Sequence, residues 1–270
     1  MYLEHFGLAL APFKPTPDPR FVFLTDQNRE IIAKAQYLLD QRLGIGVVFG
    51  EVGVGKSSTA RLIYQQLRDD PAHVVGSIAN PSARSECQFV RSLCRAFGLK
   101  SARTMQGTVD ALYDFFLANY EESRTTSLIL DEAQVLAGRR ALLEQLRLLT
   151  NFETDEDKLF NVLLFGQDEL RTALLKPRMR AFKSRVAIQA TLDPLSHEDT
   201  IAMIRFRLTV AGTDRELFTP EAYLSIHKHS RGVPRSICVI ADNALIRAFA
   251  RNAERVQVDM VEQSAAELVL

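Results

Sequence analysis

The sequence predicts an α/β fold in which a parallel five-stranded sheet carries helices on both faces and is followed by a small helical domain. Three observations lead to this expectation. Short apolar strands alternate with helical segments, a glycine-rich loop follows the first strand, and no further clear strand appears after Pro194. We therefore expect an N-terminal strap over residues 1–25, an α/β domain over 26–193 and a helical lid domain over 194–270.

Residues 11–19 of the strap are expected to be extended. Four prolines exclude a helix interior between residues 11 and 19, because proline lacks an N–H group and its ring collides with the preceding turn. Four phenylalanines offer apolar anchors along the strap. The prolines are Pro12, Pro15, Pro17 and Pro19, and the phenylalanines are Phe6, Phe13, Phe21 and Phe23.

The α/β and lid domains are predicted from the spacing of their apolar residues. Thr25 or Asp26 is expected to cap a helix that runs to about Arg42. Later helices of the α/β domain are expected over residues 56–68, 86–97, 109–121 and 140–149. The strands are expected over residues 45–49, 74–79, 127–130, 161–165 and 186–190. In the lid domain, helical spacing covers residues 196–210, 220–229 and 234–250.

The composition is that of a folded chain without net charge. Apolar residues make up 47% and charged residues 24%, and 33 Lys plus Arg balance 33 Asp plus Glu. Either there is no polyanionic partner, or any DNA contact comes from a local patch. No apolar run reaches the roughly 18–20 residues of a membrane helix, and the N-terminus lacks signal-peptide features. The three cysteines fit neither a disulfide framework nor a metal site, so we expect a cytoplasmic protein.

The strongest motif is GEVGVGKS, residues 50–57, which matches the phosphate-binding pattern G-x-x-x-x-G-K-[ST] between an expected strand and an expected helix. Its glycines allow a tight turn that directs backbone N–H groups at phosphate oxygens, and the helix N-terminus adds partial positive charge. Lys56 is expected to reach the β and γ phosphates, and the Ser57 hydroxyl to bind Mg²⁺. The alternative is a glycine turn followed by a chance Lys-Ser pair. The expected ATP ligands are Gly50, Glu51, Val52, Gly53, Val54, Gly55, Lys56, Ser57 and Ser58.

A second motif, SLILDEAQ over residues 127–134, ends an apolar strand in two acids. The carboxyl ends of parallel strands are where ligands bind in such sheets. Asp131 is expected to hold Mg²⁺ through water, and Glu132 to polarise the water that attacks the nucleotide. The alternative is a helix N-cap followed by an acidic first turn.

Gln167 and Arg235 are weaker candidates. Gln167 follows the expected fourth strand, where its amide could orient water and sense the γ-phosphate. The alternative there is an ordinary strand-to-helix turn capped by Asp168. Arg235 follows Gly232 and Pro234 near a helix start, where either a phosphate or a surface ion pair would explain a cation.

A basic segment over residues 171–185 contains no acidic residue. Such a segment is either a solvated face or the source of an arginine that reaches the γ-phosphate of a neighbouring subunit. Arg185, just before the fifth strand, is the preferred candidate, ahead of Arg178 and Arg180.

Together these motifs resemble those of the AAA+ ATPases. More closely, MYLEHFGL, PFKPTPDPRFVFLT, GEVGVGKSS, LILDEAQ, LLFGQDELR, LDPLSHEDT and RGVPRSICVIADNAL are similar to the ATPase of the general secretion pathway A type. The target-selection regulators of Tn7-like and Mu-like transposons share this ATPase core. The resemblance covers nearly the whole chain.

The resemblance implies a P-loop AAA+ fold and a role for each matching residue. It also implies ATP bound between adjacent subunits of a homo-oligomer, in a ring or a helical filament. Lys56 and Ser57 correspond to the Walker A motif, Asp131 and Glu132 to Walker B, Gln167 to sensor 1, Arg235 to sensor 2 and Arg185 to the arginine finger.

Two functions from different classes remain open. In the first, ATP drives assembly on double-stranded DNA, the assembly recruits or activates a transposase, and hydrolysis controls disassembly. The DNA contacts would come from Arg95, Lys100 and Arg103, although these residues also suit the exposed faces of amphipathic helices. In the second, a secretion or export ATPase remodels an envelope protein without binding DNA. Secretion-pathway members typically continue into a membrane helix and a peptidoglycan-binding domain, and these 270 residues contain neither, so we expect a standalone ATPase.

Overall fold

The computed structural model describes residues 2–14 and 18–267, so the strap prolines Pro15 and Pro17 lie outside the described residues. The chain forms two compact units. The α/β unit consists of Asp26–Glu51 and Thr59–Leu192. The helical unit consists of the described residues up to Thr25, the segment Val52–Ser58 and the described residues from Asp193 onward.

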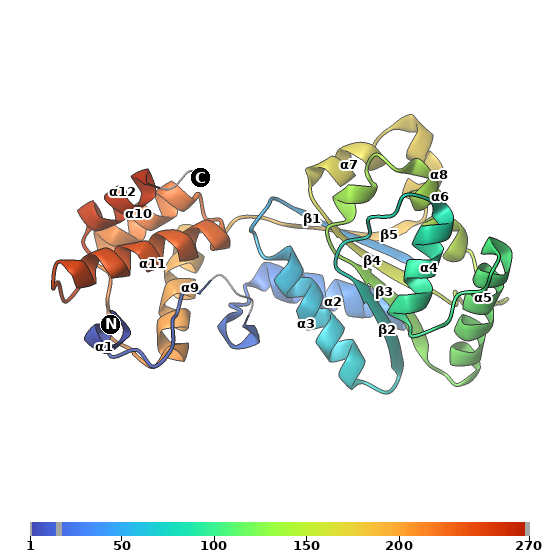
Figure 1. Cartoon of the computed structure of the whole chain (residues 1–270), viewed down its shortest axis with the longest axis horizontal. Helices are drawn as coiled ribbons and strands as arrows, with labels where there is room; N and C mark the ends of the chain where they lie inside the picture. The colour runs from blue at the N-terminus through green and yellow to red at the C-terminus, as the bar shows by residue number, and fades with distance from the viewer. Residues whose placement is uncertain (1, 15–17, 268–270) are drawn as a thin grey trace. The chain divides into compact units, whose positions relative to one another are not determined.

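The α/β unit contains the predicted parallel five-stranded sheet (Figure 1). Its strand order is β2-β3-β4-β1-β5, and every pairing is parallel. The three central strands are buried along their whole length, which explains why they read as unbroken apolar runs. The strands are β1 Ile45–Gly50, β2 His73–Ile78, β3 Thr125–Leu130, β4 Asn161–Gly166 and β5 Val186–Leu192.

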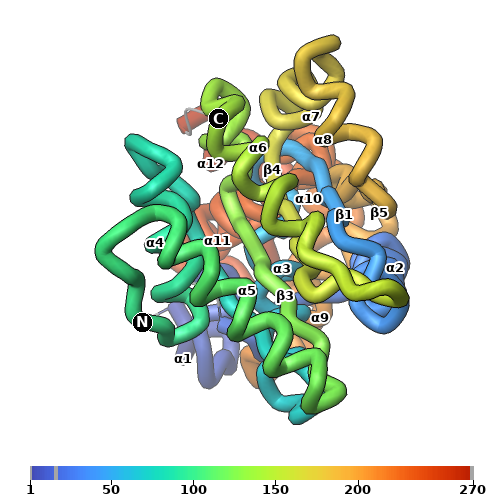
Figure 2. The backbone as a smooth tube through the Cα atoms, turned by 90° about the vertical axis from the view of Figure 1, so that its right-hand side faces the viewer, coloured from blue at the N-terminus to red at the C-terminus, as the bar shows by residue number. Residues whose placement is uncertain are grey.

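Helices cover both faces of this sheet (Figures 1 and 2). Alternate residues of β1 point to opposite faces. On one face, Ile45, Val47 and Phe49 share a core with α4 to α8. On the other face lies α2, and a Cβ added at Gly46 would be only 2.8 Å from the Leu38 side chain of that helix. Glycine at position 46 therefore lets α2 approach the sheet closely. The helices are α2 Asp26–Asp40, α3 Lys56–Asp69, α4 Glu86–Ala96, α5 Met105–Glu121, α6 Arg140–Leu149, α7 Asp168–Leu174 and α8 Arg180–Lys183, with 3₁₀ turns η2 Ala133–Leu136 and η3 Pro177–Met179.

The helical unit joins the strap to the C-terminal helices. Tyr2 donates a hydrogen bond to Asp242 at 2.8 Å, and Phe6 and Phe13 are buried in the same core as those helices. The expectation of extended backbone is wrong at Pro19, which suits the first position of a 3₁₀ turn, and helix α1 before the prolines was not expected. The elements are α1 Tyr2–Phe6, η1 Pro19–Phe21, α9 His197–Val210, α10 Pro220–Ser230, α11 Pro234–Ala250 and α12 Val258–Ala266, and the last was not expected.

Within residues 2–14 and 18–267, no helix combines the length and the apolar character that a membrane crossing requires.

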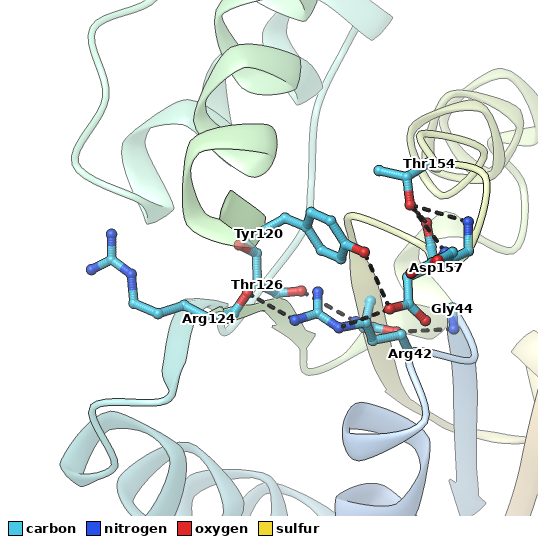
Figure 3. Close-up of polar contacts among 9 residues, drawn as sticks. Arg42, Gly44, Tyr120, Arg124, Thr126, Thr154 and Asp157 are labelled. Carbon is cyan, nitrogen blue, oxygen red and sulfur yellow. Dashed lines mark hydrogen bonds and ion pairs between the residues drawn. The ribbon is translucent and has the colours of Figure 1, made fainter. Parts of the chain in front are cut away.

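A polar cluster centred on Arg42 closes the amino-terminal edge of the sheet (Figure 3). The guanidinium of Arg42 lies 4.8 Å from the ring centre of Tyr120 and donates a hydrogen bond of 3.2 Å to the carbonyl oxygen of Arg124. Its Nε atom lies 3.9 Å from a carboxylate oxygen of Asp157, which also accepts a hydrogen bond from Tyr120 at 3.5 Å. The Arg42 side chain is only 12% exposed. This one side chain therefore links the turn after α2, the end of α5 and the loop that precedes β4.

Arg42→Ala is expected to destabilise the protein by about 1–3 kcal/mol, because it removes a cation–π contact and leaves the Arg124 carbonyl and the Asp157 carboxylate without this partner. Urea unfolding measures the change. Arg29→Ala is the matched control. It breaks an ion pair between Arg29 and Asp26, whose side chains are 67% and 98% exposed, so the free energy of unfolding should fall by less than about 1 kcal/mol. Equal losses of stability in the two variants would contradict the role assigned to Arg42.

Candidate nucleotide site

Three segments with candidate functional residues leave the sheet at one edge. The central strands β3, β4 and β1 are parallel neighbours, so their carboxyl ends lie together. Asp131 and Glu132 follow β3, Gln167 follows β4, and the glycine-rich loop follows β1. Ligands bind at this edge in open α/β sheets.

The loop after β1 has the backbone that its glycines predict, with one correction. Gly53 and Gly55 have φ values of 84° and 111°, which favour glycine, whereas Gly50 is the last residue of β1 and is not part of the turn. Helix α3 begins at Lys56, so its first N–H groups lack partners within the helix and can bind an anion. Lys56 is only 6% exposed and Ser57 is exposed.

The structure brings Arg235 to this loop within the helical unit. The backbone N–H of Arg235 donates a hydrogen bond of 3.3 Å to the carbonyl oxygen of Gly53, so the loop itself caps α11. A Cβ on Gly53 would lie 3.0 Å from both the Arg235 Cβ and a methyl group of Val233. The turn before α11 is tighter still, since a Cβ at Gly232 would lie 2.1 Å from the Leu195 carbonyl oxygen. The Arg235 side chain is exposed.

Glu132 is held by two glutamine amides. Its backbone is left-handed, with φ 52° and ψ 35°, and its N–H donates to Asp131 at 2.9 Å. The Oε2 atom of Glu132 accepts hydrogen bonds from the Gln134 side chain and, at 3.4 Å, from the Gln167 side chain. The backbone N–H of Gln167 donates to Gln134 Oε1 at 3.2 Å. The structure thus joins the expected water-activating carboxylate to the expected sensor residue through Gln134.

Sequence reasoning assigned no role to Gln134, although its place two residues after Glu132 in SLILDEAQ was a usable signal. The alternative reading in which Asp168 caps α7 is wrong. Gln167 occupies the cap position, and Asp168 is the first residue of the helix. The Gln167 side chain makes no cap hydrogen bond, and its amide donates to Glu132 instead.

The basic segment before β5 presents its candidate arginines to solvent. Arg178, Arg180 and Arg185 are exposed, and Met179 and Phe182 anchor the segment in the core. Arg171, in the same basic segment, makes contacts within the fold. Its guanidinium lies 4.7 Å from the ring centre of Phe49 and donates to Thr191 at 2.9 Å, so it supports the fold of the sheet edge. All of these residues belong to the α/β unit.

The expected DNA-contacting residues are also exposed. Arg95 lies on α4, whose opposite face buries Phe89 and Leu93, and Lys100 and Arg103 lie in the loop that leads to α5. This arrangement agrees with both readings of these cations, since an amphipathic helix exposes its polar face whether or not DNA binds there.

Comparisons with known proteins found a matching family model and a related sequence. Residues 39–174 match a family model described as AAA domain. General secretion pathway protein A of Aeromonas hydrophila is 38% identical over 270 residues, which cover 99% of this chain and 48% of that protein. The chain therefore spans about half the length of this curated relative.

Solved structures share the fold at low sequence identity. The Aeropyrum pernix ORC2 protein, in ADPNP-ADP complexes, superimposes with a TM-score of 0.72 and 17% identity over 95% of this chain and 71% of its own. The ORC1 protein of the same organism, in complex with DNA, gives a TM-score of 0.67 and 18% identity over 95% and 69% of the two chains. At these identities the likeness concerns the fold alone.

Gly53→Ala is expected to weaken ATP binding about tenfold, because a left-handed backbone costs a residue with a side chain roughly 1–2 kcal/mol and the added methyl would collide with Arg235 and Val233. Titration with a fluorescent ATP analogue measures the affinity. Gly98→Ala is the control, since Gly98 has φ 71° but a Cβ added there would meet nothing within 4 Å, and it should keep its affinity within about twofold. Equal affinities in the two variants would refute the close approach at Gly53.

Proposed function

Because the chain belongs to the AAA domain family, we propose that it binds and hydrolyses ATP and uses the cycle to act on a partner. The observation that supports this most directly is the Glu132 carboxylate, held by Gln134 and Gln167 at the sheet edge where β1 leads into the P-loop. A carboxylate placed in this way can accept a proton from an attacking water.

Each residue of the proposed site has a distinct task. The N–H groups of the loop and helix start, residues 51–58, bind the phosphates, and Lys56 neutralises the charge of the β and γ groups. Ser57 and Asp131 offer a hydroxyl and a carboxylate, the oxygen ligands that Mg²⁺ takes when most of its other ligands are phosphates and water. When bound, Mg²⁺ neutralises charge that develops on the phosphate oxygens. Gln167 and Arg235 are proposed to respond to the γ-phosphate as sensors.

We further propose that the active form is an oligomer, either a ring or a helical filament. An exposed arginine can stabilise transition-state charge on the γ-phosphate of a neighbouring subunit. Arg185 is the first candidate, and Arg178 and Arg180 on the same exposed segment are the others.

The nature of the partner is proposed from the curated relative. Identity of 38% over nearly the whole chain to General secretion pathway protein A favours a protein partner of a secretion or export system. Duplex DNA is the second candidate, and in that case the exposed cations Arg95, Lys100 and Arg103 would contact its phosphates. Recruitment of a transposase rests on the motif resemblance alone, since no protein compared above is a transposition regulator.

Glu132→Gln is expected to lower kcat at least about 100-fold while ATP affinity stays within a few-fold, because only proton acceptance from the attacking water is removed. Lys56→Ala should instead abolish nucleotide binding, because the cation that faces the phosphates is lost. Steady-state phosphate release and nucleotide titration distinguish the two effects. Wild-type turnover in Glu132→Gln would show that another group activates the water.

Long duplex DNA should stimulate turnover at low salt, and more weakly at moderate salt, if DNA is the partner. In that case the double variant Lys100→Glu, Arg103→Glu should abolish the stimulation. The slope of the logarithm of the DNA-binding constant against the logarithm of the salt concentration should become shallower by about 0.9 for each DNA phosphate that is no longer neutralised. The matched control is Arg215→Glu, Lys228→Glu, which makes the same charge change at exposed positions of the helical unit. If the rate of ATP hydrolysis is the same with and without DNA at both salt concentrations, DNA is not the partner and the proposed partner is a protein.

A further inference from the structure

We propose that Gln134 is a positioning residue for hydrolysis: its single amide ties the Glu132 carboxylate to the end of β4. The proposal rests on the function assigned to Glu132 above. It makes the placement of the water-activating group depend on a residue that contacts neither the phosphates nor the metal in the proposed scheme.

The backbone of Glu132 does not by itself determine where its carboxylate lies. The residue has a left-handed conformation, and its N–H is engaged by Asp131. A glutamate side chain has several rotatable bonds, so an unrestrained carboxylate samples many positions and loses much of its value as a catalyst. The hydrogen bonds that reach Oε2 of Glu132 come from the side chains of Gln134 and Gln167, the latter longer at 3.4 Å.

The two ends of the Gln134 amide have different partners, and only one orientation suits both. Its Nε2 group donates to the Glu132 carboxylate, and its Oε1 atom accepts from the Gln167 backbone N–H at 3.2 Å. Rotating the amide by half a turn would place oxygen against the carboxylate and N–H against N–H, which is repulsive at both contacts. The amide is therefore locked, and it transmits the position of Gln167 to Glu132.

The elements that carry these residues are packed closely enough to make the link rigid. Ala133 and Leu136, on either side of Gln134 in η2, are fully buried. A Cβ at Gly166 would lie 2.6 Å from Leu170 and 3.4 Å from the backbone nitrogen of Gln134, so η2 and the start of α7 both press against the end of β4. Packing thus sets the distance across which the Gln134 amide makes its two hydrogen bonds.

Gln134→Leu is the direct test, because it keeps the approximate volume and removes both hydrogen bonds. We expect kcat to fall about 10- to 100-fold, the effect of misplacing a catalytic group by about 1 Å, while KM and nucleotide affinity stay within about twofold. Gln134→Glu is the second variant: it is isosteric and keeps an acceptor for Gln167, but puts an oxygen against Glu132, so kcat should fall at least as far. Val135→Ala, at an exposed position of the same turn, is the control and should keep wild-type kcat.

A double-mutant cycle separates positioning from general damage. In a Glu132→Gln background, Gln134→Leu should have little further effect on single-turnover hydrolysis, because the group it positions is gone. Wild-type kcat in both Gln134 variants, with Glu132→Gln impaired, would overturn the positioning role and leave the proposed ATPase intact. An undiminished effect of Gln134→Leu in the Glu132→Gln background, or an equal loss of nucleotide affinity, would also overturn it. Wild-type turnover in Glu132→Gln would overturn the assignment of Glu132 and this proposal together.

Discussion

The parallel pairing of β4 between β3 and β1 is the constraint on which the candidate site depends. Leu130 pairs with Leu164, and Phe49 pairs with Gly166, so β3 and β1 each end within two residues of the end of β4. The strand β4 is hydrogen-bonded to β3 on one side and to β1 on the other, so its register is set by two neighbours at once. This register specifies the position of Gln167, the residue after β4, relative to Glu132 after β3.

At this edge of the sheet, a strained backbone at Glu132 occurs together with hydrogen bonds to its side chain. A left-handed backbone at a residue such as Glu132 costs of order 1–3 kcal/mol. A typical hydrogen bond contributes about 0.5–1.5 kcal/mol, so the contacts with Gln134 and Gln167 offset part of the strain. The same hydrogen bonds have a consequence for function, since they hold the Glu132 carboxylate beside the residue that follows β4.

Sequence reasoning succeeded where a signal repeats along the chain and failed where an element is short. The strands follow from short unbroken apolar runs and the long helices from a period of 3.6 residues, and α11 has the predicted bounds Pro234–Ala250. The elements η2, α7 and α8 have four to seven residues, too few turns for a helical period to show. Helix α1 was missed for the same reason, and the prolines that excluded a helix elsewhere in the strap do not reach it.

By itself, the sequence determined the main strands and helices and predicted the chemistry of the candidate nucleotide site that they carry. The motifs of the candidate site are local: a glycine-rich loop, a pair of acids after an apolar strand, and a glutamine after the next strand. A local motif can be recognised from neighbouring residues alone. Only the tertiary structure decided which residues meet. It placed the strap against helices some 240 residues away in the chain, put Arg235 against Gly53, and gave Gln134 its two partners. Those contacts depend on how strands and helices pack, and packing is a property of the whole fold that no single segment encodes.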